Sequence, residues 1–135
     1  MAPRLDSGSA WAIARYTMTL SAEEGFRRLA IGDRVLLADV TDPDGDADVP
    51  SLDDRTESLI RVAVLVPIDA PQSSYHAAVE AAMRAGVTLD DLLAALIAVA
   101  GSVGAPRVIS AAVRIALAAG YDVDAALEGT DALGR

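Results

Sequence analysis

The chain has 135 residues, of which 53% are hydrophobic and 4% aromatic, and its formal net charge is −9. This length is enough for one domain with its own core, which the composition predicts to be built mainly from Ala, Val, Leu and Ile. The negative charge argues against a nucleic-acid partner, which requires a basic surface. The absence of cysteine excludes disulfides, thiolate metal sites and thiol nucleophiles.

Residues 1–20 are expected to form an N-terminal arm or short helix, and residues 21–135 a single helical domain. The first segment contains scattered apolar side chains, but no charged stretch followed by the continuous apolar run of a signal peptide. The longest uncharged run, residues 92–106, is shorter than a membrane span. We therefore expect a cytoplasmic protein without a membrane partner.

The sequence SAEE at residues 21–24 is a capping-box pattern and predicts a helix that runs through Ile31 to Gly32. A second short helix is predicted from Asp33 to Ala38. Residues 41–50 are rich in Asp, Pro and Gly, which predicts a loop. Its glycine comes two positions too early for a calcium loop of the EF-hand type, so we expect a solvated connector.

Two helices are predicted after this loop. The first spans residues 52–66, capped by Ser51 or Asp54, and its apolar end at residues 62–66 is expected to be buried on all sides. The second spans residues 72–85 and ends at Gly86, in the position of a C-terminal cap.

Three further helices complete the all-α prediction. Thr88 is the expected N-cap of a helix over residues 89–103, in which apolar residues recur at helical spacing. Gly104 ends that helix and Pro106 begins the next, which runs to Ala119. A short helix is predicted over residues 123–127. The apolar content of residues 62–66 and 92–103 exceeds what a thin six-helix monomer would bury, so we expect a homo-oligomer.

Several motifs occur together in a recognisable order. Residues 25–33 (GFRRLAIGD) place an arginine pair before Gly-Asp, residues 52–60 (LDDRTESLI) resemble the pattern L-D-x-[KR]-T-R-[SE]-L, and His76 precedes A-x-x-x-G-V-T at residues 82–88. Over roughly residues 22–120 the chain therefore resembles the carboxymuconolactone decarboxylase and alkylhydroperoxidase-like family. This resemblance implies an orthogonal bundle of six to seven helices that assembles as a homo-trimer or hexamer, with sites near subunit contacts.

The departures from the family patterns indicate which branch is closer. Members with peroxidase activity carry C-x-x-C-x-x-x-H, and Asp69 and Gln72 occupy the two cysteine positions here, which excludes thiol peroxidase chemistry. The decarboxylase branch fits better. Its H-V-R and N-N-G-V-T motifs read H-A-A and R-A-G-V-T here, and Ser102 replaces a common tyrosine. These smaller side chains predict a substrate other than the standard muconolactone.

The resemblance implies cofactor-independent acid–base chemistry, without a metal, on a small anionic or carbonyl-bearing metabolite. His76 is the natural general acid or base, because histidine is the side chain that titrates near neutrality. A lactone carboxylate that loses carbon dioxide also needs an anion ligand and a proton delivered to carbon. The candidates are Arg28 or Arg55 for the carboxylate, His76 or Glu57 for the proton, and Tyr75 and Ser73 for the ring substituents.

Other interpretations of these residues stay open. Glu57 with Arg61, and Glu80 with Arg84, have the spacing of ordinary surface ion pairs on a helix. A non-catalytic small-ligand-binding or assembly protein that retains the fold is the alternative. A helix-turn-helix regulator, suggested by the turn at residues 85–88, is disfavoured by the negative charge and by the apolar helix that follows.

Overall fold

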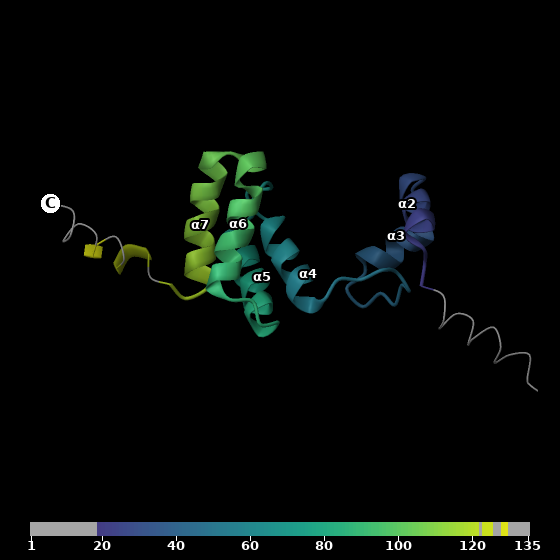
Figure 1. Ribbon diagram of the computed structural model, residues 1–135, viewed down its shortest axis with the longest axis horizontal. Helices are drawn as coiled ribbons and strands as arrows, with labels where there is room; N and C mark the ends of the chain where they lie inside the picture. The colour runs from purple at the N-terminus through teal and green to yellow at the C-terminus, as the bar shows by residue number, and fades with distance from the viewer. Residues whose placement is uncertain (1–18, 122, 126–127, 130–135) are drawn as a thin grey trace, which may run out of the picture. The chain divides into compact units, whose positions relative to one another are not determined.

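The computed structural model describes residues 19–121, 123–125 and 128–129. These residues form helices and no strand, which confirms the all-α prediction (Figure 1). The helices are α2 (Ala22–Ala30), α3 (Arg34–Thr41), α4 (Asp54–Ala63), α5 (Gln72–Arg84), α6 (Leu89–Val103) and α7 (Ala105–Ala118). The chain divides into an N-terminal unit, residues 1–51, and a C-terminal unit, residues 52–135, and each is described by itself.

Some expectations lie beyond the described residues. The predicted arm or helix over residues 1–20 falls almost wholly in residues 1–18, and it stays a prediction, as does the single domain over residues 21–135. Within the described segments, none of the helices combines the length and hydrophobicity needed to cross a membrane. Residues 123–125 are helical, but the predicted end of that helix at residue 127 lies outside the described residues.

The N-terminal unit contains α2 and α3. Ser21 is the N-cap of α2, and its hydroxyl accepts a hydrogen bond from the Glu24 N–H at 3.3 Å. The Glu24 carboxylate binds the Arg27 guanidinium at 2.7 Å, so only one half of the predicted capping box forms. The helix ends at Ala30, two residues before the predicted end, and Gly32 reverses the chain direction with a φ of 70°.

Helix α3 begins at Asp33, whose carboxylate accepts hydrogen bonds from the N–H groups of Val35 and Leu36. The helix extends to Thr41, three residues beyond the predicted end. Leu36 is the one buried hydrophobic residue among the described residues of this unit. Two short helices with so little buried surface contribute little stability by themselves.

The C-terminal unit begins with α4, which is shorter than predicted. Its N-cap is Asp53, whose carboxylate accepts from the Thr56 N–H at 3.0 Å, so the prediction of Ser51 or Asp54 was wrong. It ends at Ala63 rather than residue 66, and residues 64–69 form successive turns. Pro67 favours the early end, because a proline has no N–H to donate to the Ala63 carbonyl and its ring would clash with that carbonyl in a continued helix.

The expectation that residues 62–66 are buried on all sides was also wrong. Val62 and Val66 are buried, but Val64 is 52% exposed. Because the helix gives way to turns after Ala63, consecutive side chains of this apolar run point in different directions. Val62 and Val66 face the core, whereas Val64 faces the surface.

The residues predicted to mark the boundaries between α5, α6 and α7 are confirmed. Gly86 and Gly104 have φ values of 84° and 83°, where a side chain would be strained. Thr88 and Asp91 form a reciprocal capping box at the start of α6. Pro106 lies in the first turn of α7. Glycine and proline set these helix boundaries through local backbone geometry, which explains why the boundaries could be predicted from sequence.

The core of the C-terminal unit is shared by helices α4 to α7. Helices α5 and α6 each pack against both α4 and α7. The buried residues of this cluster are Val62, Val66, Ala70, Tyr75, Val79, Ala82, Val87, Leu92, Leu96, Ala111 and Ile115. This packing decides which side of α5 faces the interior, and hence where the candidate residues on that helix lie.

Candidate functional site

His76 lies in the first half of α5 and is exposed. It makes no hydrogen bond or ion pair with any residue that the structure describes. Ser73, one turn earlier on the same helix, is also exposed. The exposed side of α5 therefore presents an imidazole and a hydroxyl that no neighbouring side chain orients.

Tyr75 lies beside His76 in sequence but, about 100° further round the helix, it faces the interior. It is 1% exposed and belongs to the core of the C-terminal unit. Burial raises the pKa of its phenol, against a smaller opposing effect of the Arg114 guanidinium. Tyr75 is consequently neutral at physiological pH, and its role as a substrate ligand stays a prediction.

Glu57 lies in a cleft between α4 and α5. This open cleft of ≈ 350 Å³ is lined by Asp54, Glu57, Ser58, Arg61, Ala81, Arg84 and Ala85. Glu57 pairs with Arg61 at 2.5 Å, and Arg84 pairs with Glu80 at 3.2 Å, which confirms both ion pairs expected from the spacing. What the spacing did not reveal is that Arg61 and Arg84 share one cleft, because that depends on how α4 packs on α5.

The two arginines predicted to bind a carboxylate each hold a carboxylate of their own unit. Arg28, in the N-terminal unit, pairs with Asp33 at 2.6 Å, and this contact together with two backbone N–H groups lowers the pKa of Asp33 to about 2. Arg55, in α4, pairs with Asp91 of α6 at 2.5 Å. An anionic ligand would have to compete with these carboxylates.

The lowered pKa of the Asp91 carboxyl is expected to make the stability of the C-terminal unit depend on pH. The Thr88 N–H and hydroxyl, and then Arg55, lower the pKa of Asp91 from an ordinary 3.8 to about 2. Its stabilising effect is therefore present above the unfolded-state pKa and is lost as pH falls through about 2. The urea midpoint of the wild type should exceed that of Asp91→Asn at neutral pH, and the difference should shrink between pH 4 and pH 2. A difference that stays constant over this range would contradict the assignment.

The two positions that carry cysteine in peroxidase members belong to a different arrangement here. Asp69 has a φ of 50° and pairs with Arg114 at 2.6 Å. Arg114 also donates to the Ala70 carbonyl at 2.8 Å, and the Gln72 side chain donates to the Arg114 carbonyl at 3.0 Å. We call this set of contacts the Arg114 clamp. It joins α7 to the turn before α5, a contact that sequence analysis missed because the partners lie more than 40 residues apart.

Removal of the Arg114 clamp is expected to destabilise the C-terminal unit. Arg114→Met should lower the free energy of unfolding by about 2 kcal/mol, because it leaves a part-buried carbonyl without its donor. The exposed partner Asp69 adds little to this loss. The measurement is urea denaturation followed by circular dichroism. Arg84→Met, which breaks a more exposed pair, is the control and should cost about 0.5 kcal/mol or less. Equal midpoints for both variants would show that the clamp is not stabilising.

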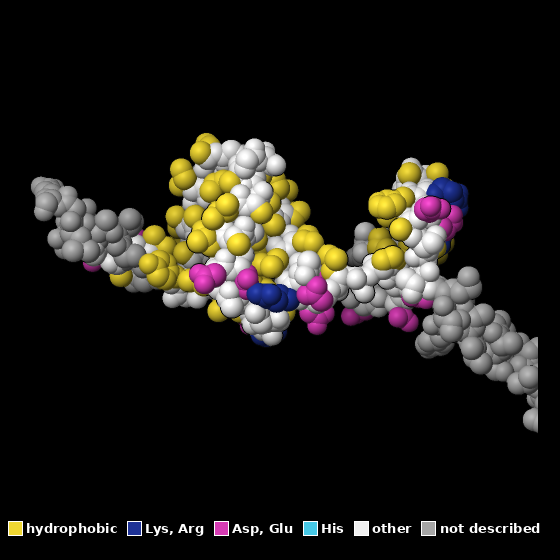
Figure 2. All heavy atoms as spheres, in the orientation of Figure 1, with side chains coloured by type: hydrophobic (Ala, Val, Ile, Leu, Met, Phe, Trp, Pro, Cys, Tyr) yellow, Lys and Arg dark blue, Asp and Glu magenta, His cyan; other side chains and the backbone are white. Residues whose placement is uncertain are grey.

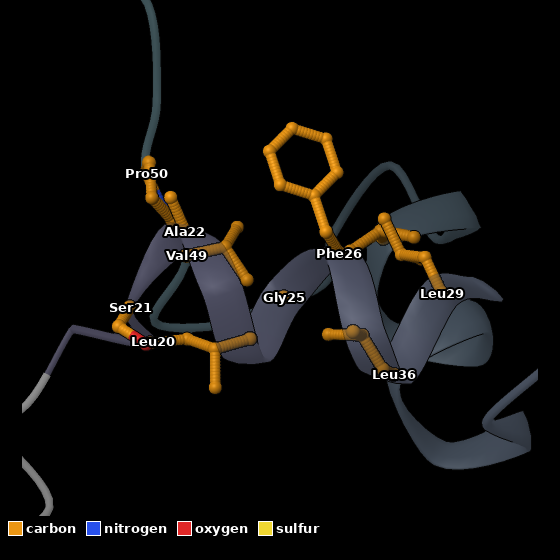
Figure 3. A pocket seen from close by; sticks show the side chains of 10 residues that line it. Leu20, Ser21, Ala22, Gly25, Phe26, Leu29, Leu36, Val49 and Pro50 are labelled. Carbon is orange, nitrogen blue, oxygen red and sulfur yellow. The ribbon is translucent and has the colours of Figure 1, made fainter. Parts of the chain in front are cut away.

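Two further hollows in the structure are apolar. One, of ≈ 350 Å³, lies in the N-terminal unit and is lined by Leu20, Ser21, Ala22, Gly25, Phe26, Leu29, Leu36, Val40, Val49 and Pro50 (Figure 3). The other, of ≈ 200 Å³, lies between α6 and α7. The first has no titratable side chain in its lining and the second has only Asp90, so neither is suited to acid–base chemistry.

Of the candidate residues, Ser73 and His76 lie one turn apart on the exposed side of α5, and Glu57 is the one candidate that lines the α4–α5 cleft. Glu57 shares its cleft with Ser58, Arg61 and Arg84, whereas His76 does not line that cleft. His76 precedes Arg84 by eight residues of α5, about 12 Å along the helix axis. In the described part of the chain, no group of three His, Asp or Glu side chains is arranged to hold a metal ion.

The region from the loop before α4 to the end of α7 matches a known protein family. The model described as the carboxymuconolactone decarboxylase family matches residues 40–118, more than half of the chain. The matched region contains α4 to α7 together with His76 and Glu57, and it excludes the segment at residues 25–33. No curated protein and no solved structure matches the chain significantly.

Proposed function

The chain belongs to the carboxymuconolactone decarboxylase family, and from this premise we propose that it performs cofactor-independent acid–base chemistry on a small metabolite. The substrate is anionic or carbonyl-bearing, and the reaction is a decarboxylation or an isomerisation. The observation that supports the proposal best is the state of His76. It is the one histidine of the chain, it is exposed, and it lies within the region that the family model matches.

His76 is proposed as the general acid or base. When a carboxylate on the carbon next to a carbonyl leaves as carbon dioxide, the electron pair of the broken C–C bond passes into that carbonyl and forms an enolate. The resulting enolate must then take up a proton at carbon. An imidazole can deliver this proton at neutral pH and be recharged by solvent. Isomerisation needs the same transfer in both directions, so one residue serves either reaction.

Glu57 is proposed as the alternative proton-transfer group, since His76 does not line the cleft in which Glu57 lies. Its carboxylate lies in the α4–α5 cleft, where the guanidinium groups of Arg61 and Arg84 provide positive charge for an anionic substrate. Guanidinium groups bind carboxylates in a two-pronged geometry, which favours a substrate that carries one. Arg28, Arg55, Tyr75 and Ser73 stay proposed ligands, with Arg28 and Arg55 required to exchange their present carboxylate partners.

A substrate panel tests the proposal. The wild-type protein would be incubated in deuterated water with small lactone carboxylates, β-keto acids and matched compounds that lack the carboxylate. Proton NMR would record loss of the carboxylate and deuterium at the neighbouring carbon. We expect turnover or exchange for at least one carboxylate-bearing compound and none for its matched neutral analogue.

The same samples test a non-catalytic ligand-binding role. This alternative is supported by the absence of an orienting partner for His76 among the described residues, since catalytic histidines are usually positioned by a second group. The single histidine gives one resolved imidazole signal in NMR. A compound that shifts this signal without turnover or deuterium exchange would favour the binding protein over the enzyme. If the panel produced neither a shift nor turnover, the proposed substrate class would be wrong.

A further inference from the structure

The Arg114 guanidinium is held in place with one of its binding edges open. Its Nη1 atom donates to the Asp69 carboxylate at 2.6 Å and to the Ala70 carbonyl at 2.8 Å. No described residue accepts a hydrogen bond from its Nε or Nη2. These two nitrogens form an edge of the guanidinium plane that can bind a carboxylate through two parallel hydrogen bonds. We call it the Nε/Nη2 edge.

The other described arginines do not combine these features. In the ion-paired ones, Nε or Nη2 already binds a carboxylate; these are Arg27, Arg28, Arg55, Arg61 and Arg84. Arg34 is exposed and has no ion pair among the described residues. Arg107 is exposed and donates through Nη1 to one acceptor, the Pro67 carbonyl. Arg114 has two acceptors at Nη1 and a side chain that is only 30% exposed, so little freedom remains to be lost when a ligand binds.

The hydroxyl of Tyr75 is a second group without a partner in this region. No described residue forms a hydrogen bond with it, and no fully buried side-chain oxygen of the described residues lacks a partner. The 1% of Tyr75 that is exposed therefore includes its hydroxyl. Burial raises the pKa of this phenol, and the nearby charges of Arg114 and Asp69 respectively lower and raise it. The phenol stays protonated at neutral pH and can donate to an anion beside Arg114.

His76 lies one turn along α5 from the residues that hold Arg114. The Gln72 side chain donates to the Arg114 carbonyl at 3.0 Å, so this side of α5 faces α7. His76 follows Gln72 by four residues, and residues four apart are neighbours on a helix surface. The rise between them is about 6 Å. Arg84, by contrast, lies two turns beyond His76 and lines the α4–α5 cleft.

Asp69 limits the charge of a ligand at the Nε/Nη2 edge. Its carboxylate already neutralises Arg114, so one further carboxylate leaves the cluster with a charge of −1, and a second would be repelled. On the face of α6 and α7 that Figure 2 shows, few charged side chains lie among the hydrophobic ones, so this face offers little compensation. The arrangement therefore favours a monocarboxylate over a dicarboxylate.

We propose that the Nε/Nη2 edge of Arg114 and the Tyr75 hydroxyl bind the carboxylate of a small monocarboxylate substrate and direct its neighbouring carbon toward His76. The reaction at that carbon rests on the proposed function, whereas binding of the carboxylate does not require turnover. Nε and Nη2 donate one hydrogen bond each, and the phenol donates a third. Asp69 stays bound at Nη1, so no carboxylate has to be displaced, as it would be at Arg28 or Arg55.

Binding of the carboxylate can be measured without turnover. The chain has one histidine, so the imidazole of His76 gives one set of proton NMR signals to follow while sodium levulinate, a stable γ-keto carboxylate, is added. Levulinate should shift these signals until the site is saturated. Methyl levulinate, its neutral ester, should cause no saturable shift. The dicarboxylate γ-oxopimelate should bind about threefold more weakly than levulinate.

Arg114→Lys keeps a positive charge beside Asp69 but removes the Nε/Nη2 edge. It should raise the dissociation constant of levulinate about tenfold or more. For a compound that is turned over, it should raise KM more than it lowers kcat. Arg107→Lys is the matched control, because Arg107 lies on the same helix and also donates to a turn carbonyl through Nη1. This variant should keep the wild-type dissociation constant.

Asp69→Asn tests the same site in the opposite direction. Removal of the negative charge beside Arg114 should lower the dissociation constant of levulinate about threefold and should remove the discrimination against γ-oxopimelate. Asparagine tolerates the positive φ of this position, 50°, so the backbone should be kept. Asp44→Asn makes the same change in net charge in the N-terminal unit and should leave the dissociation constant unchanged.

The outcomes separate the carboxylate site from the proposed function. Levulinate binding that Arg114→Lys weakens supports the site even if no compound of the panel is turned over. Turnover with a KM that Arg114→Lys leaves unchanged supports the function but overturns the site. The absence of a saturable shift in the wild type also overturns it. A dissociation constant raised by Arg84→Lys but not by Arg114→Lys assigns the carboxylate to the α4–α5 cleft. If Arg114→Lys loses helical circular dichroism, an unchanged dissociation constant in Asp69→Asn decides against the site.

Discussion

Replacement of His76 by glutamine is expected to lower kcat for the proposed decarboxylation or isomerisation by about 10²- to 10⁴-fold, the usual contribution of a general acid or base. Glutamine preserves the size and hydrogen-bonding capacity of the side chain but cannot carry the proton. Because His76 is exposed and makes no hydrogen bond in the described structure, the variant should fold as the wild type does. The measurement is kcat on the best substrate of the panel, with circular dichroism to check the fold.

Two further variants separate catalysis from a change in the surface. Ala77→Gln places the same side chain on the neighbouring exposed position of α5 and should keep the wild-type kcat. His76→Ala should be inactive and should regain part of its activity when imidazole is added to the buffer. Unchanged kcat in His76→Gln would transfer the proton-transfer role to another group, of which Glu57 is the first to examine.

Replacement of Tyr75 by alanine is expected to lower the free energy of unfolding by about 3–5 kcal/mol. Its ring is among the largest fully buried side chains and packs in one cluster with Val79 and Leu92. Removal of the ring would leave a cavity that the surrounding helices can close only in part. Urea denaturation of the variant and wild type measures the difference. Tyr121→Ala, at a 49% exposed tyrosine, should change stability by about 0.5 kcal/mol or less.

The hydroxyl of Tyr75 can be examined separately from its ring. Tyr75→Phe keeps the buried ring and should change stability by no more than about 1 kcal/mol. If the hydroxyl contacts the substrate, this variant should raise KM while it keeps the fold. If KM and kcat are both unchanged, Tyr75 is a core residue alone. A loss of stability in Tyr75→Ala no larger than in Tyr121→Ala would contradict the burial described above.

The helix boundaries that sequence predicted well are those with a local chemical cause. Gly86, Gly104 and the Thr88–Asp91 capping box act within one or two turns of the chain, so their effects need no knowledge of distant residues. The prediction for α4 was less accurate. Its apolar run favoured continuation to residue 66, whereas the helix ends at Ala63, whose carbonyl Pro67 cannot serve with a backbone N–H.

The positions of the candidate site residues depend on helix packing more than the helix boundaries do. The four-residue spacing predicted two separate ion pairs, Glu57 with Arg61 and Glu80 with Arg84. Only the packing of α4 on α5 places Arg61 and Arg84 in one cleft. The same packing turns Tyr75 inward and leaves His76 outside, although they are adjacent in sequence. Helical geometry separates neighbours by about 100°, but which direction is the interior is set by the other helices.

The sequence by itself determined the all-helical class, most helix boundaries, the family, and the exclusion of thiol chemistry. These follow from local propensities, from motif spacing, and from the absence of cysteine. Only the tertiary structure decided that Asp69 and Gln72 join the Arg114 clamp and that the apolar residues of α6 and α7 lie partly outside the core. The physical reason is that each of these outcomes depends on contacts between residues far apart in the chain, which no local pattern encodes.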